Sequence, residues 1–264
     1  MRNRKGSQEQ ALAAMELCVK NGFRVMSQTQ VHRQNLDCLM PTAMLLNNIG
    51  VDTIRLIRTT DAPRWHENAP DSCLDIDEYY AAMLDFARQY KDSGLNMNVI
   101  VWQFLRLYPQ GKYYTLAPVH SPNGTIKENE PICKGNRGMV AVTSSGEVVP
   151  CLQMSGYMQE QGLRFGNLHE TPLRQILTEG AYVDAVCADL HKQLEDNPKC
   201  AACQYYRYCN GGCPALSLLY TGNMLGSDPA KCRFYQNGWY EKTVQAMGEW
   251  HNSSQITKLS TDSL

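Results

Sequence analysis

The chain has 264 residues, of which 43% are hydrophobic, so it is long enough for one large domain or two smaller ones with a real core. Its 25 Lys and Arg residues nearly balance its 26 Asp and Glu residues, and the formal net charge of -1 offers no basic surface for nucleic acid or an anionic membrane. No apolar run approaches the roughly 18 to 20 residues of a membrane-spanning helix, and no secretory signal follows Met1, so we predict a cytoplasmic protein.

Apolar spacing predicts three helix-strand units in the first 107 residues. Helices are expected at about 8–21, 36–48 and 76–93, and strands at about 23–31, 51–58 and 97–102. Strict alternation of helices and strands implies parallel strands with right-handed crossovers. The first domain, residues 1–107, is therefore predicted to be part of an α/β layer or barrel.

The pattern changes at about residue 108, where closely spaced prolines and glycines predict a connector, residues 108–130, without helical or strand period. A second domain is predicted at 131–249. Its expected elements are a hairpin at 138–150, a helix near 171–191 and a helix at about 231–248. The polar tail, residues 250–264, is predicted to be disordered.

A cysteine-rich stretch, Cys200-x2-Cys203-x5-Cys209-x3-Cys213-Pro214, dominates the second domain. A C-x2-C pair sets two thiolates on one tight turn, and soft sulfur selects zinc, copper(I) or iron-sulfur centres. Gly211 and Gly212 let the backbone approach a bound group. Eleven cysteines in a cytoplasmic chain favour metal binding or redox function over disulfides. Four of them are isolated and are predicted to be free thiols: Cys18, Cys38, Cys73 and Cys187.

Seven cysteines of the second half form one layout, in which Cys133-x12-Gly146-x4-Cys151 precedes the cysteine-rich stretch and Cys232 follows it. This layout resembles the SPASM domain of many radical SAM enzymes over about residues 133–240. The resemblance implies two auxiliary [4Fe-4S] clusters. By that family's wiring, the first cluster is held by Cys133, Cys151 and Cys213, and the second by Cys200, Cys203, Cys209 and Cys232. Some members supply one more cysteine just before the first, but residues 125–132 contain none, and the sequence leaves the fourth ligand open.

The first half is similar to the last three α/β units of the six-unit partial barrel of radical SAM enzymes. Barrel sites lie at the carboxyl ends of the strands. The resemblance therefore implies a cavity lined by Gln30, His32, Arg58, Thr60 and Gln103. The C-x3-C-x2-C loop that holds the SAM-binding cluster of that family does not occur in the sequence. We therefore expect an N-terminally truncated member, in which S-adenosylmethionine is a cofactor only of an intact relative.

The resemblance implies an oxidoreductase that modifies a peptide or protein side chain. In intact relatives, S-adenosylmethionine is cleaved reductively to a radical that abstracts hydrogen from the substrate, with electrons from a donor such as ferredoxin or flavodoxin. Leu152 follows Cys151 where sulfatase-maturing relatives carry an aspartate, which favours ribosomal-peptide maturation instead. The sequence predicts no catalytic residue. Two alternatives stay open: a non-catalytic iron-sulfur electron-transfer or peptide-binding module that works with a partner, and a structural zinc protein.

Overall fold

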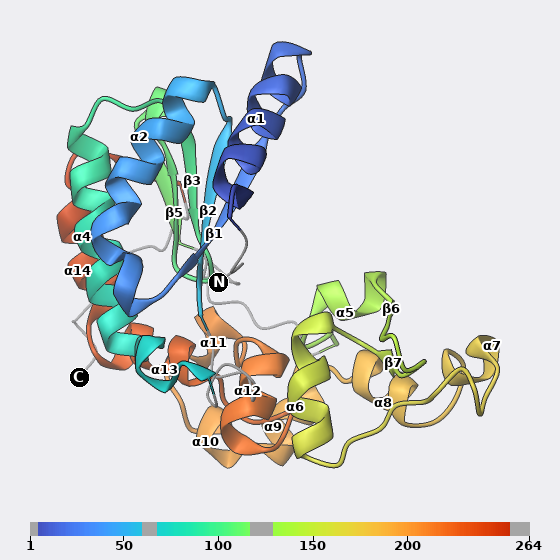
Figure 1. Ribbon diagram of the computed structural model, residues 1–264. Helices are drawn as coiled ribbons and strands as arrows, with labels where there is room; N and C mark the ends of the chain where they lie inside the picture. Colours follow the sequence, from blue (N-terminus) through green and yellow to red (C-terminus); the bar gives the residue numbers. More distant parts are fainter. Residues whose placement is uncertain (1–4, 60–67, 117–128, 254–264) are drawn as a thin grey trace. The chain divides into compact units, whose positions relative to one another are not determined.

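The computed structural model of the protein describes residues 5–59, 68–116 and 129–253 (Figure 1). These residues form two compact units. The first contains residues up to 59, 69–116 and 239–253, and the second contains 129–238. The domain boundaries predicted from the sequence stay a prediction. The helix at 239–247, which the sequence analysis placed in the second domain, lies in the first unit. No helix within the described ranges combines the length and apolar character needed to cross a membrane.

The first unit is built around one six-stranded sheet with the order β1-β2-β3-β4-β5-β8. The strands β1, β2 and β3 are parallel, β4 and β5 run antiparallel to their neighbours, and β8 is parallel to β5. The predicted α/β class and the three parallel strands are thus confirmed. In chain order the elements are α1 (Ser7–Lys20), β1 (Met26–Val31), η1 (Arg33–Cys38), α2 (Leu39–Ile49), β2 (Thr53–Arg58), η2 (Pro70–Ser72), α4 (Ile76–Asp92), β3 (Asn98–Val101), β4 (Leu105–Tyr108), η3 (Pro109–Gly111), β5 (Tyr113–Leu116), α14 (Trp239–Met247) and β8 (His251–Asn252).

Two predictions about the edges of this unit are wrong. Residues 108–116 were expected to form an irregular connector, but they complete the β4–β5 hairpin, because Lys112 turns the chain with a φ of 48° and Tyr108 stacks on Tyr113. The tail is ordered at His251–Asn252, which pair with the first residues of β5. The remainder of the predicted connector, 117–128, and of the predicted tail, 254–264, lies outside the described residues.

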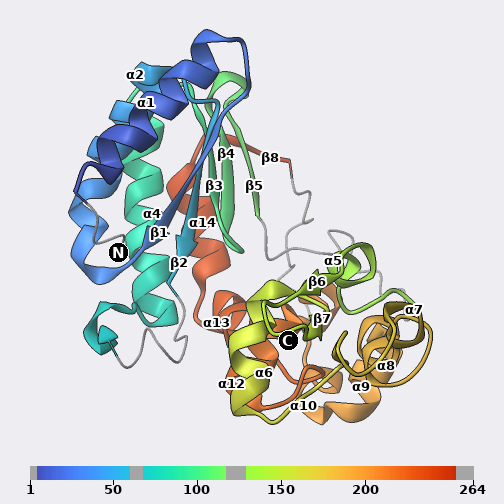
Figure 2. The same cartoon turned by 45° about the vertical axis from the view of Figure 1, so that its right-hand side comes forward.

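Helices α2, α4 and α14 cover one face of the sheet (Figures 1 and 2). Tyr80 of α4 is nearly fully buried between Phe104 and Trp239, with ring centroids 4.9 Å and 5.7 Å away. The indole Nε1 of Trp239 donates to Asp77 Oδ1 at 2.7 Å, so the only polar atom of this buried ring is satisfied. This anchor explains why α14 packs on α4, a helix that is distant in the sequence.

The start of α4 offers a direct test of local stability. Glu78 N donates to Asp75 Oδ1 at 2.9 Å, and Asp75 N donates to Glu78 Oε2 at 3.1 Å, which is a capping box. Because the Asp75→Ala variant loses a side-chain cap, we expect it to lower the free energy of unfolding by about 1 kcal/mol, measured by urea denaturation. The matched control is Asp85→Ala, at an exposed position of the same helix. An equal loss in both variants would show that the cap contributes nothing.

The second unit consists of a two-stranded antiparallel hairpin and short helices. Its elements are α5 (Lys134–Gly138), β6 (Ala141–Val142), β7 (Val148–Val149), η4 (Leu152–Met154), α6 (Ser155–Glu160), α7 (Leu173–Ile176), α8 (Ala181–Cys187), α9 (Leu190–Asp196), α10 (Pro198–Ala201), α11 (Tyr206–Cys209), α12 (Pro214–Thr221) and α13 (Pro229–Gln236). The hairpin is confirmed. The two long helices predicted here are wrong, because Gly180 and Gly238 adopt φ of 80° and 70° and interrupt them.

Short elements leave this unit with small, separate apolar clusters. One lies around Val149, Met154 and Leu218, a second around Leu190 and Tyr206, and a smaller third contains Val148, Ile176 and Tyr182. Small cores supply little net stability by themselves, and proteins of this kind are commonly stabilised by bound metal. The packing of the second unit therefore agrees with a metal-stabilised fold.

Candidate metal centre

The first two cysteines of the cysteine-rich stretch are positioned by the cap of α10. Asn197 precedes the helix, and its Oδ1 accepts a hydrogen bond from Cys200 N at 3.2 Å. Cys203 N then donates to Cys200 O at 3.1 Å, which closes a tight turn between the two cysteines. The sequence C-A-A-C thus produces the turn that a C-x2-C pair requires.

The next two cysteines are joined by a sharp reversal of the chain. Asn210, Gly211 and Gly212 are three consecutive residues in the left-handed region, with φ of 50°, 73° and 87°. A Cβ on Gly211 would collide with Gln193, and one on Gly212 would collide with Asp228. Both glycines are therefore required by backbone conformation and by close packing, and they return the chain from Cys209 to Cys213.

Four thiols surround one cavity in this unit. Cys200, Cys203, Cys209 and Cys232 all line one cavity, together with three tyrosine rings. Its lining contains Tyr205, Tyr206 and Tyr235, and the rings of Tyr205 and Tyr235 are stacked with centroids 5.2 Å apart. These four cysteines are the set that the resemblance assigns to the second cluster.

Burial governs the chemistry of these thiols. Desolvation, followed by the charge of neighbouring cysteines, raises the pKa of Cys200 to about 12. Burial likewise raises the pKa of Cys209 to about 11. Unliganded Cys200 and Cys209 are therefore protonated at neutral pH, and only a bound metal or cluster would make thiolates of them. Among the described residues, no three Cys, His, Asp or Glu side chains lie close enough together to hold a single metal ion.

The remaining predicted ligands are only partly brought together. Cys151 and Cys213 pack against the same apolar cluster, which contains Val149, Met154 and Ala215. Cys133 precedes α5, and its sulfur would lie 3.6 Å from a Cβ on Gly135. The assignment of Cys133, Cys151 and Cys213 to one cluster therefore stays a prediction.

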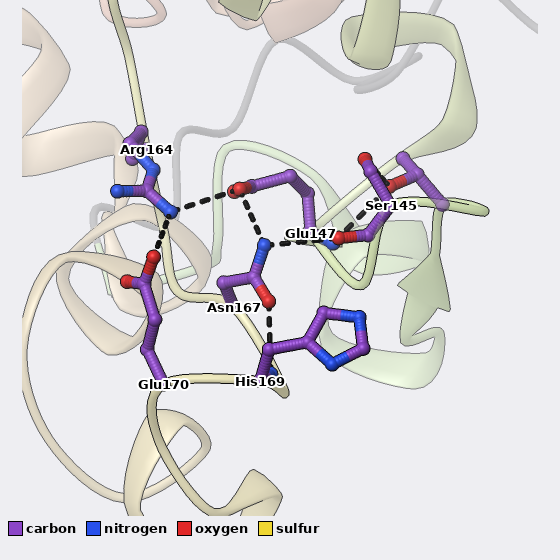
Figure 3. Close-up of polar contacts among 7 residues, drawn as sticks. Ser145, Glu147, Arg164, Asn167, His169 and Glu170 are labelled. Carbon is purple, nitrogen blue, oxygen red and sulfur yellow. Dashed lines mark hydrogen bonds and ion pairs between the residues drawn. The ribbon is translucent and has the colours of Figure 1, made fainter.

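The glycine of the C-x12-G-x4-C spacing has a clear structural cause. Gly146 lies in the hairpin turn with a φ of 81°, and a Cβ there would lie 2.7 Å from His169 Cδ2 and 2.8 Å from Asn167 Oδ1. Figure 3 shows Asn167 and His169 side by side next to this turn. Asn167 Nδ2 donates to Ser145 O at 3.0 Å, so the asparagine clamps the turn from outside. The clamp fixes the strand that leads to Cys151.

An ion network holds this clamp in place (Figure 3). Arg164 Nη2 donates to Glu147 Oε1 and to Glu170 Oε1, both at 2.9 Å, and Asn167 Nδ2 donates to the same Glu147 oxygen at 2.7 Å. Hydrogen bonds from Asn167 and Arg164 hold the pKa of Glu147 below its usual range. The carboxylate therefore stays ionised at neutral pH and binds the hairpin to the segment after α6.

We expect the Gly146→Ala variant to lose about 2 to 4 kcal/mol of unfolding free energy, because it combines left-handed strain with overpacking against Asn167 and His169. The matched control is Gly162→Ala, a left-handed glycine at the end of α6 in the same unit, with a φ of 64° and nothing within 4 Å of its Cβ. Strain alone should cost the control about 1 to 2 kcal/mol. Chemical denaturation measures both losses of unfolding free energy. Equal losses would show that crowding by Asn167 and His169 contributes nothing at Gly146.

The predicted cavity residues of the first unit do not all share one face of the sheet. Val31 pairs with Arg58 and Gln30 pairs with Ile57, so the side chains of Gln30 and Arg58 point to opposite faces. Arg58 is buried on the helix side, where its Nη1 donates to Leu74 O at 3.2 Å. These positions are on β1 and β2, near their carboxyl ends.

The other predicted cavity residues follow the strands. His32 is buried directly after β1, and its Nδ1 lies 2.9 Å from Gln34 Oε1. Gln103 adopts a φ of 56° in the turn after β3. Thr60 lies outside the described residues. Gln30, His32 and Gln103 are thus at the carboxyl ends of the two parallel strands β1 and β3, and their role as cavity lining stays a prediction.

Sequence reasoning missed two arginines on the sheet face opposite the helices. Arg55 pairs with Gln28 on one side and Ile100 on the other, and Arg106 pairs with the same Ile100, so all four share this face. The guanidinium of Arg55 lies 4.1 Å from the Trp102 ring centroid, and desolvation and the charge of Arg106 lower its pKa. Arginines that alternate with buried Ile54, Leu56, Leu105 and Leu107 were the available signal.

Comparison with known proteins identifies the metal-binding segment. A model of the SPASM family, an iron-sulfur cluster-binding domain, matches residues 133–204. The AdoMet-dependent heme synthase of Methanosarcina barkeri (strain Fusaro / DSM 804) is 24% identical over 233 residues, which are 86% of this chain and 61% of that protein.

Solved structures agree on the fold. Native anSMEcpe with bound AdoMet and Cp18Cys peptide aligns with a TM-score of 0.56 at 15% identity, over 91% of this chain and 62% of that chain. Streptococcus suis SuiB bound to S-adenosylmethionine aligns with a TM-score of 0.54 at 13% identity, over 85% of this chain and 48% of that chain. Residues 133–204 thus match the SPASM family, and the chain as a whole is similar to radical SAM/SPASM proteins.

The chain spans 61% of the heme synthase and 62% of anSMEcpe. The SPASM match includes Cys133, Cys151, Cys200 and Cys203 and ends before the last three predicted ligands. For Cys209 and Cys232, the support comes from the cavity that they share with Cys200 and Cys203.

Proposed function

We propose that this protein binds two auxiliary [4Fe-4S] clusters and takes part in the oxidative modification of a peptide or protein side chain. The observation that carries the proposal is the gathering of Cys200, Cys203, Cys209 and Cys232 around one cavity. These residues are separated by up to 32 positions in the sequence. A common bound group would explain why their thiols line the same cavity. The second set is Cys133, Cys151 and Cys213.

The cavity fits a cluster by its donors and its lining. Four soft sulfur ligands around a largely aromatic space suit an iron-sulfur centre, and Gly211 lets the backbone come close to it. A single zinc ion would need its four sulfurs within about 2.3 Å of one point, whereas a four-iron cluster spreads them over separate irons. When bound, such clusters accept or pass on single electrons. The tyrosines around the cavity would shield them from water.

The peptide substrate is supported by the structural neighbours. The anSMEcpe structure contains AdoMet and a peptide, and SuiB has been solved with its precursor peptide SuiA, with a TM-score of 0.53. We propose that the sheet face bearing Gln28, Gln30, Arg55 and Arg106 meets the substrate, together with His32 and Gln103. Two arginines on this face favour a substrate with acidic groups.

A second substrate class is favoured by the sequence relative, which is named a heme synthase. Titration of the protein with heme, followed by its Soret absorbance, separates the two classes. Under the peptide proposal we expect no saturable binding at micromolar heme. Saturable binding that weakens in the Arg55→Ala variant would replace the peptide by a heme-type substrate.

A non-catalytic electron-transfer role is the second candidate function, because the same four-cysteine cavity would serve it. Absorbance and EPR spectra of anaerobically purified protein test the iron-sulfur proposal that both functions share. We expect brown protein with iron and acid-labile sulfide. Colourless protein with stoichiometric zinc would overturn the proposal and establish a structural metal site.

A further inference from the structure

A buried aspartate and a buried lysine lie beside the cysteine-rich stretch, at positions that the sequence did not single out. Asp228 is 0% exposed and Lys231 is 3% exposed, and both belong to the first turn of α13 and its cap. Burying charges costs several kcal/mol unless they are compensated, so such a pair needs a structural or functional reason.

Asp228 connects the two ends of the proposed cluster site. Its Oδ2 accepts a hydrogen bond from Cys213 N at 3.0 Å, and its Oδ1 accepts one from Ala230 N at 2.8 Å. Its backbone oxygen accepts from Cys232 N at 3.0 Å, and its backbone N donates to Gly211 O at 3.2 Å. The aspartate is thus immobile and satisfied mainly by backbone donors.

Lys231 and this aspartate lie side by side next to Gly212. A Cβ on Gly212 would lie 2.7 Å from both Lys231 Cγ and Asp228 Oδ2, so the glycine makes room for the two side chains. Lys231 also lines the cavity of the four thiols. Burial lowers the pKa of Lys231, whereas the charges of Asp228, Cys209 and Cys213 raise it, and the two cysteines come one from each proposed ligand set.

A cation in this position has a defined effect on an iron-sulfur cluster. A cluster with thiolate ligands is negatively charged, and reduction adds one more negative charge. A nearby buried cation therefore stabilises the reduced form more than the oxidised form, and low dielectric strengthens the effect. An exposed cation at the same sequence distance from a ligand is screened by water and salt.

We propose that Lys231, positioned by Asp228, is the buried counter-charge that raises the reduction potential of the clusters bound through Cys209 and Cys213. The inference rests on the proposed iron-sulfur function. The redox step is the uptake of one electron by an oxidised cluster from a low-potential donor. In the assay this donor is dithionite, which is oxidised to sulfite.

The test compares Lys231 and Lys199. Each directly precedes a proposed cysteine ligand, but Lys231 is buried and Lys199 is exposed. The reconstituted full chain is titrated with dithionite and followed by EPR. In Lys231→Met, the ratio of reduced to oxidised cluster at a fixed potential should fall at least about tenfold, which is about 59 mV for a one-electron couple. In Lys199→Met, which replaces the exposed lysine before Cys200, the ratio should change less than about twofold. Equal shifts in both variants would overturn the proposal.

A second variant keeps the proposal testable if Lys231→Met does not fold. Asp228→Asn removes the negative charge of the pair and keeps an oxygen acceptor, so it should raise the potential, the opposite sign to Lys231→Met. The double variant should fall between them. If Asp228→Asn loads its clusters and its potential is unchanged or lower, the counter-charge assignment is wrong. Iron content of the wild-type chain is measured first: without bound iron the proposed function itself fails, and the inference with it.

Discussion

Anaerobic reconstitution with iron and sulfide is expected to load about eight irons per chain, as two four-iron clusters. The Cys203→Ser variant should lose one cluster signal and keep the other, because Cys203 lines the cavity with Cys200, Cys209 and Cys232. Cys151→Ser should do the reverse, because Cys151 belongs to the other proposed set. Iron and sulfide analysis and EPR spectra of the two variants measure the outcome.

The control for both variants is Cys18→Ser, at an exposed thiol of α1 that belongs to neither set. Its iron content should equal that of the wild-type chain. About four irons in the wild type would reduce the proposal to one cluster. Loss of both signals in both serine variants would show that the second unit collapses as a whole, a result that its small apolar clusters make physically reasonable.

The 264-residue chain alone is expected to form no 5′-deoxyadenosine from S-adenosylmethionine and dithionite, even with both auxiliary clusters filled. Radical generation in the family needs an iron site on a C-x3-C-x2-C loop, and this sequence contains no such loop. An auxiliary cluster does not replace it, because the cleaved bond must be held beside both the iron and the substrate. Chromatography of the reaction mixture measures the product.

The decisive comparison for this prediction adds the cluster-binding half of a complete relative. Product formed only in the mixture would support the proposal that this chain supplies the second half of a radical SAM/SPASM enzyme. Product formed by the isolated chain would refute the dependence on the missing loop. No product in either sample would favour the non-catalytic electron-transfer role, provided that the mixture contains all clusters.

Several features were predictable because they depend on local chemistry. The alternation of helices with strands, the hairpin before Cys151 and the spacing of the cysteines are all encoded by neighbouring residues. The glycines at 146, 211 and 212 were also visible, although the side chains that crowd them were not. Residue spacing restricts which thiols can share a turn, and this restriction does not depend on how the rest of the chain packs.

Other features could not be predicted because they depend on contacts between distant residues. The helix expected at 231–248 breaks at Gly238, so that α14 can donate the Trp239 indole to Asp77 of α4. Residues 113–116 became a strand because a partner, β4, was available for pairing. Local propensity is a weak guide where packing over a long sequence separation decides the conformation.

The sequence by itself determined the α/β class of the first unit and the SPASM spacing of the cysteines, because periodicity and metal-ligand spacing are properties of adjacent residues. The resemblance implied that Cys232 joins Cys200, Cys203 and Cys209, and the tertiary structure places all four at one cavity. It alone separated Gln30 from Arg58 and buried Lys231 beside Asp228. Sheet register and the burial of charge depend on which surfaces meet, and that depends on the free energy of the whole folded unit.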